Sequence, residues 1–459
     1  MHYLVLALII AVGIGDQLTT DHILPKPFSF VPDGLSALVV LYVVAFGARQ
    51  RFQYVRASYW LVFGTIAAVV VCGAFANDEA PGPLFAGIRF YCRALPLFFL
   101  PAVYEFKPWQ IRQQLRLLLL IGVLQLPFAG YQRWIVMRAN RFSGDSVVGT
   151  LADSSVMSMY LICAVCILTG FFLRRRISKL TYFVFFFYLL AATAINETKG
   201  TLILLPFALL AAALVGSPPA KRIRIFFLTV VLFAAFLAGF APIYDYMQRK
   251  NPYFVSIEDF FTNEKKVDKY LEKHSGVGTH QLAGRVDSIV VPLRQLSRDP
   301  AQLAFGLGIG NASHSSLGPQ FIGAYNVLYS GFLVSSFSIF LLEIGVFGTA
   351  LVFVLYWLIL VDSLAIARTD DGFMGAVASG WAGITVLMTI ATPYITTHIF
   401  PCLSYLFWYF SGLIAATRMR TVLAAQEQRQ LMPASQAMGP MLGAHGRRAV
   451  PGSNVPHSR

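Results

Sequence analysis

The sequence predicts an all-α, polytopic membrane protein, and three observations support this prediction. Hydrophobic residues make up 57% of the 459 residues and charged residues only 13%, about half of the ~25% charge of ordinary soluble domains. Twelve apolar segments approach the length that a helix needs to cross a hydrocarbon core of roughly 30 Å. A polar stretch of 88 residues, 244–331, separates the ninth segment from the tenth. We therefore expect about twelve transmembrane helices and one large loop outside the membrane.

The predicted spans lie on both sides of the long loop. Nine precede it, within residues 1–243, and three follow it, within residues 332–417. The first segment lacks a basic start and a cleavage site, so it predicts a membrane helix and not a signal peptide. Residues 418–459 are rich in Gln, Ala, Gly, Pro and Arg and predict a disordered cytoplasmic tail. The twelve segments are 2–15, 35–48, 58–76, 84–104, 115–136, 155–173, 179–195, 200–215, 223–243, 332–361, 375–392 and 400–417.

Lysine and arginine residues predict the orientation of the helices. Of the 36 such residues, 20 lie in the tail and in short loops on the side of the N-terminus, nine in the long loop, and seven elsewhere on the opposite side. A long loop does not count in the positive-inside rule, so the comparison is 20 against 7. Both termini are therefore predicted in the cytoplasm and the long loop outside. The net charge of +14 is explained by topology and by anionic lipid head groups, and does not indicate nucleic-acid binding.

Other basic residues gather at the predicted outer ends of the helices, where charged groups often mark a cavity or a pathway. Arg89 and Arg93 are four residues apart, so they share one face of a predicted helix. Guanidinium groups that converge from several spans would bind a diphosphate or a carboxylate, whereas isolated ones would reach lipid phosphates. The candidate anion-binding residues are Arg89, Arg141, Lys199, Arg285 and Arg294.

Two patterns organise the second half of the long loop. From Arg285 to Ser297, apolar residues recur every three or four positions, which predicts an amphipathic helix. The run Gly306–Asn311 follows no strand and lacks Gly-Lys-Ser/Thr, so it is neither a dinucleotide-binding motif nor a P-loop. It predicts either a tight turn near the membrane or a nest of backbone N–H groups, in which Gly308 and Gly310 would bind phosphate.

Candidates for acid/base chemistry are few, and metal chemistry is not indicated. His314 and Asp287 are the candidate general bases of the long loop. No D-x-D or H-E-x-x-H motif occurs, and the loop histidines lack metal-ligand spacing, so we expect neither a metal nor another cofactor. Cys163 and Cys166 form a C-x-x-C pair inside a predicted span, which indicates helix packing and not a redox centre.

Five short motifs occur in a fixed order between residues 84 and 361. They are Arg141-Phe-Ser-Gly-Asp145, Glu197-Thr-Lys-Gly200, Gly284-Arg285, Gly306-Leu-Gly-Ile-Gly310 and Leu342-Glu-Ile-Gly-Val-Phe-Gly348. In the order of these motifs and in its late polar loop, the chain resembles the superfamily of O-antigen ligases and Wzy-type polysaccharide polymerases. Members of that superfamily are polytopic membrane proteins with a large periplasmic loop and no nucleotide-binding domain.

The resemblance implies a reaction and a set of partners. The donor would be an oligosaccharide repeat unit on undecaprenyl diphosphate, at the periplasmic face of the bacterial inner membrane. Because the lipid diphosphate is already an activated leaving group, neither a metal nor a nucleotide sugar is needed if basic groups neutralise it. A flippase and a chain-length regulator are the implied protein partners. Arg141, Lys199 and Arg285 would clamp the diphosphate, and His314 or Asp287 would deprotonate the acceptor hydroxyl.

The chain departs from the family pattern at two places, and the second of them, a missing histidine, favours a polymerase over a ligase. Lys199 stands where members usually carry arginine, which keeps the charge but loses bidentate geometry. Ligases carry a histidine at the place of Val334. A ligase that attaches glycan to lipid or protein therefore remains an alternative, as does a transporter. A transporter would be favoured by charged or broken spans in both halves of the chain, whereas the arginines here gather at one face.

Overall fold

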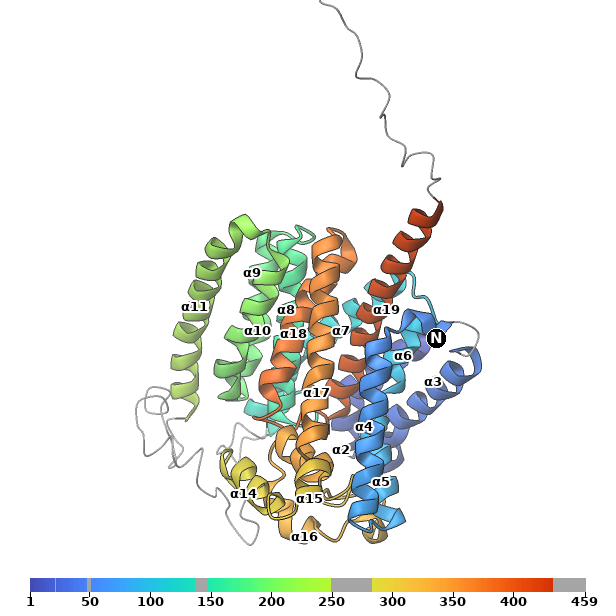
Figure 1. Ribbon diagram of the computed structural model, residues 1–459. Helices are drawn as coiled ribbons and strands as arrows, with labels where there is room; N and C mark the ends of the chain where they lie inside the picture. Colours follow the sequence, from blue (N-terminus) through green and yellow to red (C-terminus); the bar gives the residue numbers. More distant parts are fainter. Residues whose placement is uncertain (21, 48–50, 137–146, 249–282, 432–459) are drawn as a thin grey trace, which may run out of the picture. The chain divides into compact units, whose positions relative to one another are not determined.

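The described part of the chain is helical (Figure 1). The computed structural model describes residues 1–20, 22–47, 51–136, 147–248 and 283–431. Within these ranges there is no strand, and seven helices are long and apolar enough to cross a membrane. The number becomes eight if the bent pair α5 (Pro81–Cys92) and α6 (Pro96–Val103) forms one broken span. The prediction of an all-α, polytopic membrane protein is confirmed, whereas the count of twelve spans and the position of the long loop stay predictions.

Each predicted apolar segment overlaps a helix or a bent helix pair. The expected amphipathic helix after Arg285 is also present, as α14. Besides α5 and α6, the helices are α1 (His2–Ile10), continued by a π-helical turn to Gly15, α2 (Asp16–Thr20), α3 (Val31–Gly47), α4 (Ala57–Ala76), α7 (Pro108–Trp134), α8 (Ser154–Leu173), α9 (Lys179–Ile195), α10 (Gly200–Gly216), α11 (Arg222–Gln248), α14 (Asp287–Leu296), α15 (Pro300–Phe305), α16 (Asn326–Tyr329), α17 (Ser336–Thr369), α18 (Phe373–Ala391) and α19 (Pro401–Leu431).

Prolines and capping side chains determine where several helices begin. Pro81, Pro96 and Pro108 occupy the first turn of α5, α6 and α7, where a missing N–H group leaves no hydrogen bond unmade. Asp153 accepts hydrogen bonds from backbone N–H groups in the first turn of α8, and Ser335 does the same for α17. These starts are therefore encoded locally in the sequence.

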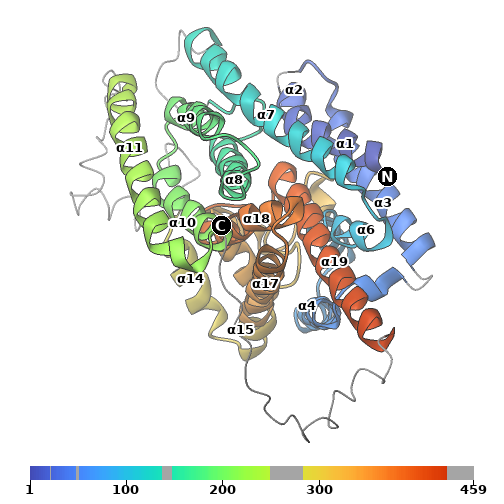
Figure 2. The same cartoon turned by 90° about the horizontal axis from the view of Figure 1, so that it is seen from above.

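The centre of the unit formed by residues 1–419 is α18, which Figure 2 shows between α8, α10, α17 and α19. Small residues allow close helix contact here. A Cβ atom added to Gly380 would lie 2.8 Å from Cα of Ile167, and one added to Gly383 would lie 2.5 Å from the carbonyl oxygen of Ala208. Close approach of backbones at glycine is how membrane helices gain packing without help from the hydrophobic effect.

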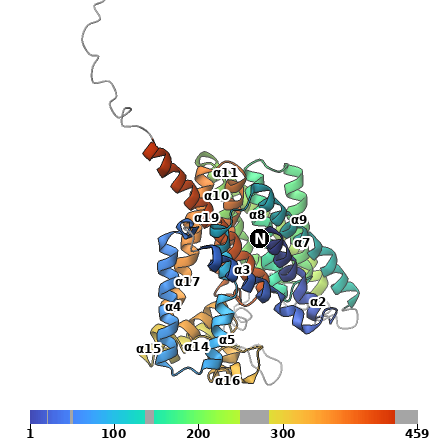
Figure 3. The same ribbon diagram turned by 90° about the vertical axis from the view of Figure 1, so that its right-hand side faces the viewer.

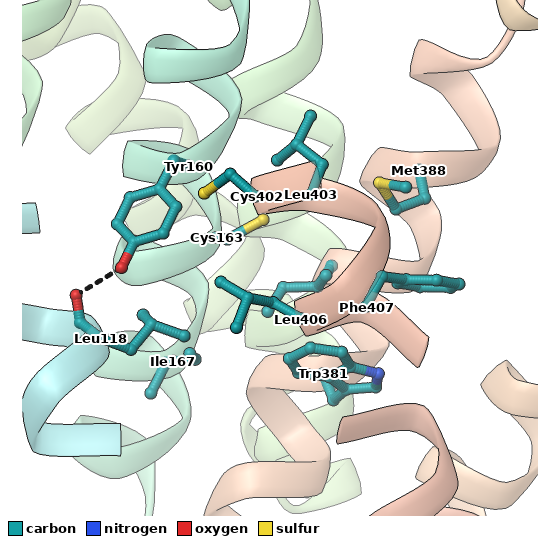
Figure 4. A pocket seen from close by; sticks show the side chains of 11 residues that line it. Leu118, Tyr160, Cys163, Ile167, Trp381, Met388, Cys402, Leu403, Leu406 and Phe407 are labelled. Atoms are coloured by element: carbon teal, nitrogen blue, oxygen red, sulfur yellow. Dashed lines mark hydrogen bonds between the residues drawn. The ribbon is translucent and has the colours of Figure 1, made fainter. Parts of the chain in front are cut away.

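The C-x-x-C pair lies in this core. Cys166 is fully buried, and Cys163 borders a small apolar cavity of about 20 Å³ between α7, α8, α18 and α19 (Figure 4). The Tyr160 hydroxyl at its edge donates to the carbonyl of Leu118 at 2.7 Å, so the polar atom is satisfied. Both cysteines are free thiols, and their surroundings are those of helix packing.

The bundle has two ends with different chemistry. At the basic end, Arg112, Arg116, Arg176 and Phe373 line one pocket, and Arg174 binds Asp371. Because α17 ends and α18 begins there, the first residue of α17 and the last of α18 lie at the opposite end, which we call the loop end. Figures 1 and 3 place α14, α15 and α16 at the loop end, beside the start of α5.

Candidate functional site

Arg285 lies at the loop end, two residues before α14 begins. Its guanidinium donates to the backbone carbonyl of Val334 at 2.6 Å and lies 5.1 Å from the centre of the Tyr394 ring. The segment is held in place because the N–H of Ala283 donates to the carbonyl of Gly331 at 2.8 Å. A guanidinium has five N–H donors, and only one is bonded within the described residues. The partly exposed side chain can therefore bind an anion.

Lys199 lies on the turn between α9 and α10. Glu197 of this turn has a φ of 60°, in the left-handed region, and its carboxylate accepts a hydrogen bond from Arg133 at 2.6 Å. A backbone conformation of this kind costs about 1–3 kcal/mol in a residue other than glycine and persists only where its surroundings impose it. The largely buried ion pair with Arg133 holds the Glu197 carboxylate in place. The Lys199 ammonium lies 5.7 Å from the centre of the Tyr244 ring.

Tyr394 links the Lys199 turn to Arg285. A Cβ atom added to Gly200 would lie 2.7 Å from Cε1 of Tyr394, so the ring rests directly on the glycine that follows Lys199. The face of the same ring carries the Arg285 guanidinium, an attractive cation–π geometry. Two predicted anion-binding motifs that are far apart in the sequence thus meet at one aromatic side chain.

The segment that carries Tyr394, residues 392–400, is fastened to the start of α17. The Ser336 N–H donates to the carbonyl of Ile395 at 3.0 Å, and the Ser336 hydroxyl lies 2.7 Å from Nδ1 of His398. Burial, and to a lesser extent the positive charge of Arg93, lowers the pKa of His398 to about 3. The imidazole is therefore neutral near pH 7 and too weak a base for proton transfer there. We assign His398 a role in holding the segment.

A second basic cluster lines a polar pocket of about 260 Å³, which we call the arginine pocket. Arg89 of α5 and Arg93, the residue after α5, both line it, which agrees with the shared face predicted from their spacing, and Gly310 and the exposed His314 line it as well. Arg89 is ion-paired with Asp33 of α3, which also accepts a hydrogen bond from the Tyr405 hydroxyl. Arg93 donates to the carbonyl of Ile399. The pocket therefore combines fixed guanidinium groups with a histidine on a loop. It is lined by Ala86, Gly87, Arg89, Phe90, Arg93, Gly310, Ser313, His314, Ser315, Ser316 and Ile399.

An apolar pocket of about 360 Å³ adjoins the arginine pocket. The two share Phe90, and consecutive residues line them in two further places, Ile309 with Gly310 and His398 with Ile399. Side chains of α4, α5, α17 and α19 form its walls. A pocket lined by arginines beside an apolar one fits an amphiphile that has an anionic head and a hydrocarbon tail.

The glycine run is wedged between helices. Gly308 and Gly310 have φ values of 97° and 83°, and added Cβ atoms would lie 2.8 Å from Cδ of Glu79 and 2.8 Å from the backbone nitrogen of Gly87, respectively. Burial, and then the nearby Glu343, raises the pKa of Glu79 to about 8. This packing is that of a tight turn. Gly310 borders the arginine pocket, whereas Gly308 faces a carboxyl group, and phosphate binding by either one stays a prediction.

The other predicted residues are dispersed. Arg294 is exposed on α14, whose buried side holds Pro292 and Leu296. Asp287 is half-buried and opens α14, two residues after Arg285. Arg141 lies outside the described residues, so the structure does not place it.

Sequence reasoning missed Tyr394, His398 and the ion pair between Arg133 and Glu197. A signal was present for the segment 392–400, because threonines and a histidine interrupt an otherwise apolar region there. No known family model matches the chain, and no curated protein matches it at a significant level.

Proposed function

We propose that this protein is a metal-independent glycosyltransferase that polymerises oligosaccharide repeat units carried on undecaprenyl diphosphate, at the periplasmic face of a bacterial inner membrane. The observation that carries the proposal is that Gly200, which follows Lys199, and Arg285 both contact the Tyr394 ring. Both belong to motifs through which the chain resembles the polymerase and ligase superfamily. A cationic turn packed against the ring that carries a guanidinium suits a diphosphate leaving group, whose charge must be stabilised as it departs.

The reaction needs one bond to form and one to break. The acceptor hydroxyl oxygen bonds to the anomeric carbon of the donor, while the bond from that carbon to the diphosphate oxygen breaks with its electron pair. The hydroxyl proton passes to a base, for which Asp287, two residues from Arg285, and His314, in the arginine pocket, are the candidates. The basic groups then hold the released polyprenyl diphosphate.

The adjoining pockets support a lipid-linked substrate. The polyprenyl tail suits an apolar pocket among helices that can span the membrane, and the arginine pocket beside it suits a charged group. We expect Arg89 to keep its ion pair with Asp33 and so to hold α5 and α3 together at the pocket. We expect Arg93 and His314 to be the groups that present polar atoms to the substrate.

The proposal is tested by replacing Arg285 with alanine in purified protein supplied with a lipid diphosphate-linked repeat unit. We expect long polymer to be lost while protein abundance stays near that of the wild type, because the side chain is partly exposed. Arg298→Ala is the matched control, since it removes an exposed arginine shortly after α14. Normal polymer from Arg285→Ala would refute the clamp. A product extended by a single transfer would favour a ligase, and lipid translocation without transfer would favour a transporter.

A further inference from the structure

The basic end carries a pocket that the proposed reaction does not use. It measures about 400 Å³ and lies between α7, the end of α8 and the start of α18. Arg112, Arg116 and Arg176 line it, and the remaining lining residues, including Leu115 and Phe373, are apolar. The pocket thus combines three guanidinium groups with apolar walls, at the end of helices that can span a membrane. The proposed reaction does not account for this combination.

The charges in this pocket are not balanced by the residues that line it. Arg112 and Arg116 are four residues apart on one face of α7, where like charges repel each other. None of the lining residues is acidic. Asp370 and Asp371, which shortly precede the lining residue Phe373, are already engaged, because Asp371 pairs with Arg174 and Asp370 accepts hydrogen bonds from backbone N–H groups at the start of α18. A bound anion would offset the repulsion.

The walls indicate the kind of anion. Leu115 and Leu119 lie on the same face of α7 as the two arginines, and Leu168 and Phe171 of α8 stand opposite them. The Phe373 ring lies 5.1 Å from the Arg112 guanidinium and orients it. A soluble phosphate would leave this apolar surface uncovered, whereas a phospholipid brings a phosphate together with acyl chains. We propose that the pocket binds the phosphate of an anionic phospholipid from the bilayer leaflet at the basic end.

The test measures lipid binding to the full-length protein in detergent, by native mass spectrometry and by the shift in melting temperature. The probes are diphosphatidylglycerol, phosphatidylcholine and inorganic phosphate. We expect diphosphatidylglycerol to bind to the wild-type protein and raise its melting temperature, and the other two probes to do neither. Equal binding of phosphatidylcholine, or saturation by inorganic phosphate alone, would overturn the proposal, because the site would then not select a lipid phosphate.

A pair of triple variants separates the pocket from general surface charge. Replacing Arg112, Arg116 and Arg176 with glutamine should weaken diphosphatidylglycerol binding by roughly tenfold or more, since each basic residue near a membrane surface contributes to the attraction. The control replaces Arg175, Lys179 and Arg224, which are exposed and do not line the pocket. It removes the same charge and should change binding by less than about twofold. Equal losses of diphosphatidylglycerol binding in the two variants would refute the site. If the pocket variant folds poorly, the binding of the three probes to the wild-type protein still decides whether the site selects an anionic phospholipid.

Discussion

The most informative perturbation is at Tyr394, because this side chain touches both halves of the proposed diphosphate site. Its ring rests on Gly200 and carries the Arg285 guanidinium 5.1 Å from its centre. A cation–π contact contributes about 0.5–1 kcal/mol when exposed and about 2 kcal/mol when desolvated. Arg285 is partly buried, so we take about 1–2 kcal/mol, which corresponds to roughly a 5- to 30-fold change in rate if the contact positions the guanidinium for the transition state. Tyr394→Ala should lose polymer output by that factor.

The variant Tyr394→Phe separates the role of the Tyr394 ring from that of its hydroxyl. Phenylalanine keeps the ring face for Arg285 and its contact with Gly200, so we expect output within about twofold of the wild type. Output is measured as polymer formed per unit of purified protein at saturating donor, with the melting temperature of each variant recorded as a control for folding. An equal loss in both variants would refute positioning by the ring and assign the effect to the hydroxyl. Normal output from Tyr394→Ala would remove Tyr394 from the site altogether.

Lys199, Glu79 and the orientation of the chain in the membrane can each be tested separately. If Lys199 supplies only charge, Lys199→Arg should keep substantial polymerising activity. Lys199→Gln should lose about ten- to a hundredfold in activity, because a hydrogen bond to a charged group contributes about 1.5–3 kcal/mol. Near-normal polymer output from Lys199→Gln would exclude Lys199 from the proposed site. The raised pKa of Glu79 means that the folded state keeps a proton that the unfolded state loses, so this group's contribution to stability is complete below about pH 4.5 and is lost as the pH rises through about 8. The melting temperature of Glu79→Gln should therefore rise relative to that of the wild type as the pH increases from 5 to 8. A difference that stays constant across that range would contradict the raised pKa of Glu79. In a cysteine-free background, an impermeant maleimide should label Ala324→Cys in intact cells but label Ser178→Cys only after permeabilisation; the reverse pattern would invert the topology.

The positions of the helices could be predicted from local sequence because local physics sets them. Apolar length and periodicity identified the segments, and α14 begins within two residues of the predicted start at Arg285. The shared face of Arg89 and Arg93 was equally local, since residues four apart on a helix always lie on one side. The arginine pocket also contains His314 and Gly310, which lie on the loop before α17. The sequence therefore indicated the residues of this pocket individually, but it did not show that they lie together.

The site at Tyr394 could not be predicted because its members are joined only by tertiary packing. Residues 200, 285 and 394 belong to three separate segments, and no periodicity connects them. Their meeting depends on α17 and α18 presenting the segment 392–400 to the start of α10. The resemblance singled out Lys199 and Arg285, but it could not identify the aromatic ring between them.

Under the proposed function, Val334, which stands where the ligases of the resembled superfamily carry a histidine, bears on the choice of the general base. Arg285 binds the backbone carbonyl of Val334, so the side chain at this position can change without moving the guanidinium. Under the proposed function, Arg285 can therefore belong to an anion clamp although position 334 carries no titratable group. His398, on the neighbouring segment, does not substitute for it, because its pKa of about 3 makes it a poor proton acceptor near pH 7. In the proposed reaction the acceptor proton would go to another group, and Asp287, on the first turn of the helix that Arg285 precedes, is the candidate base closest in sequence to Arg285.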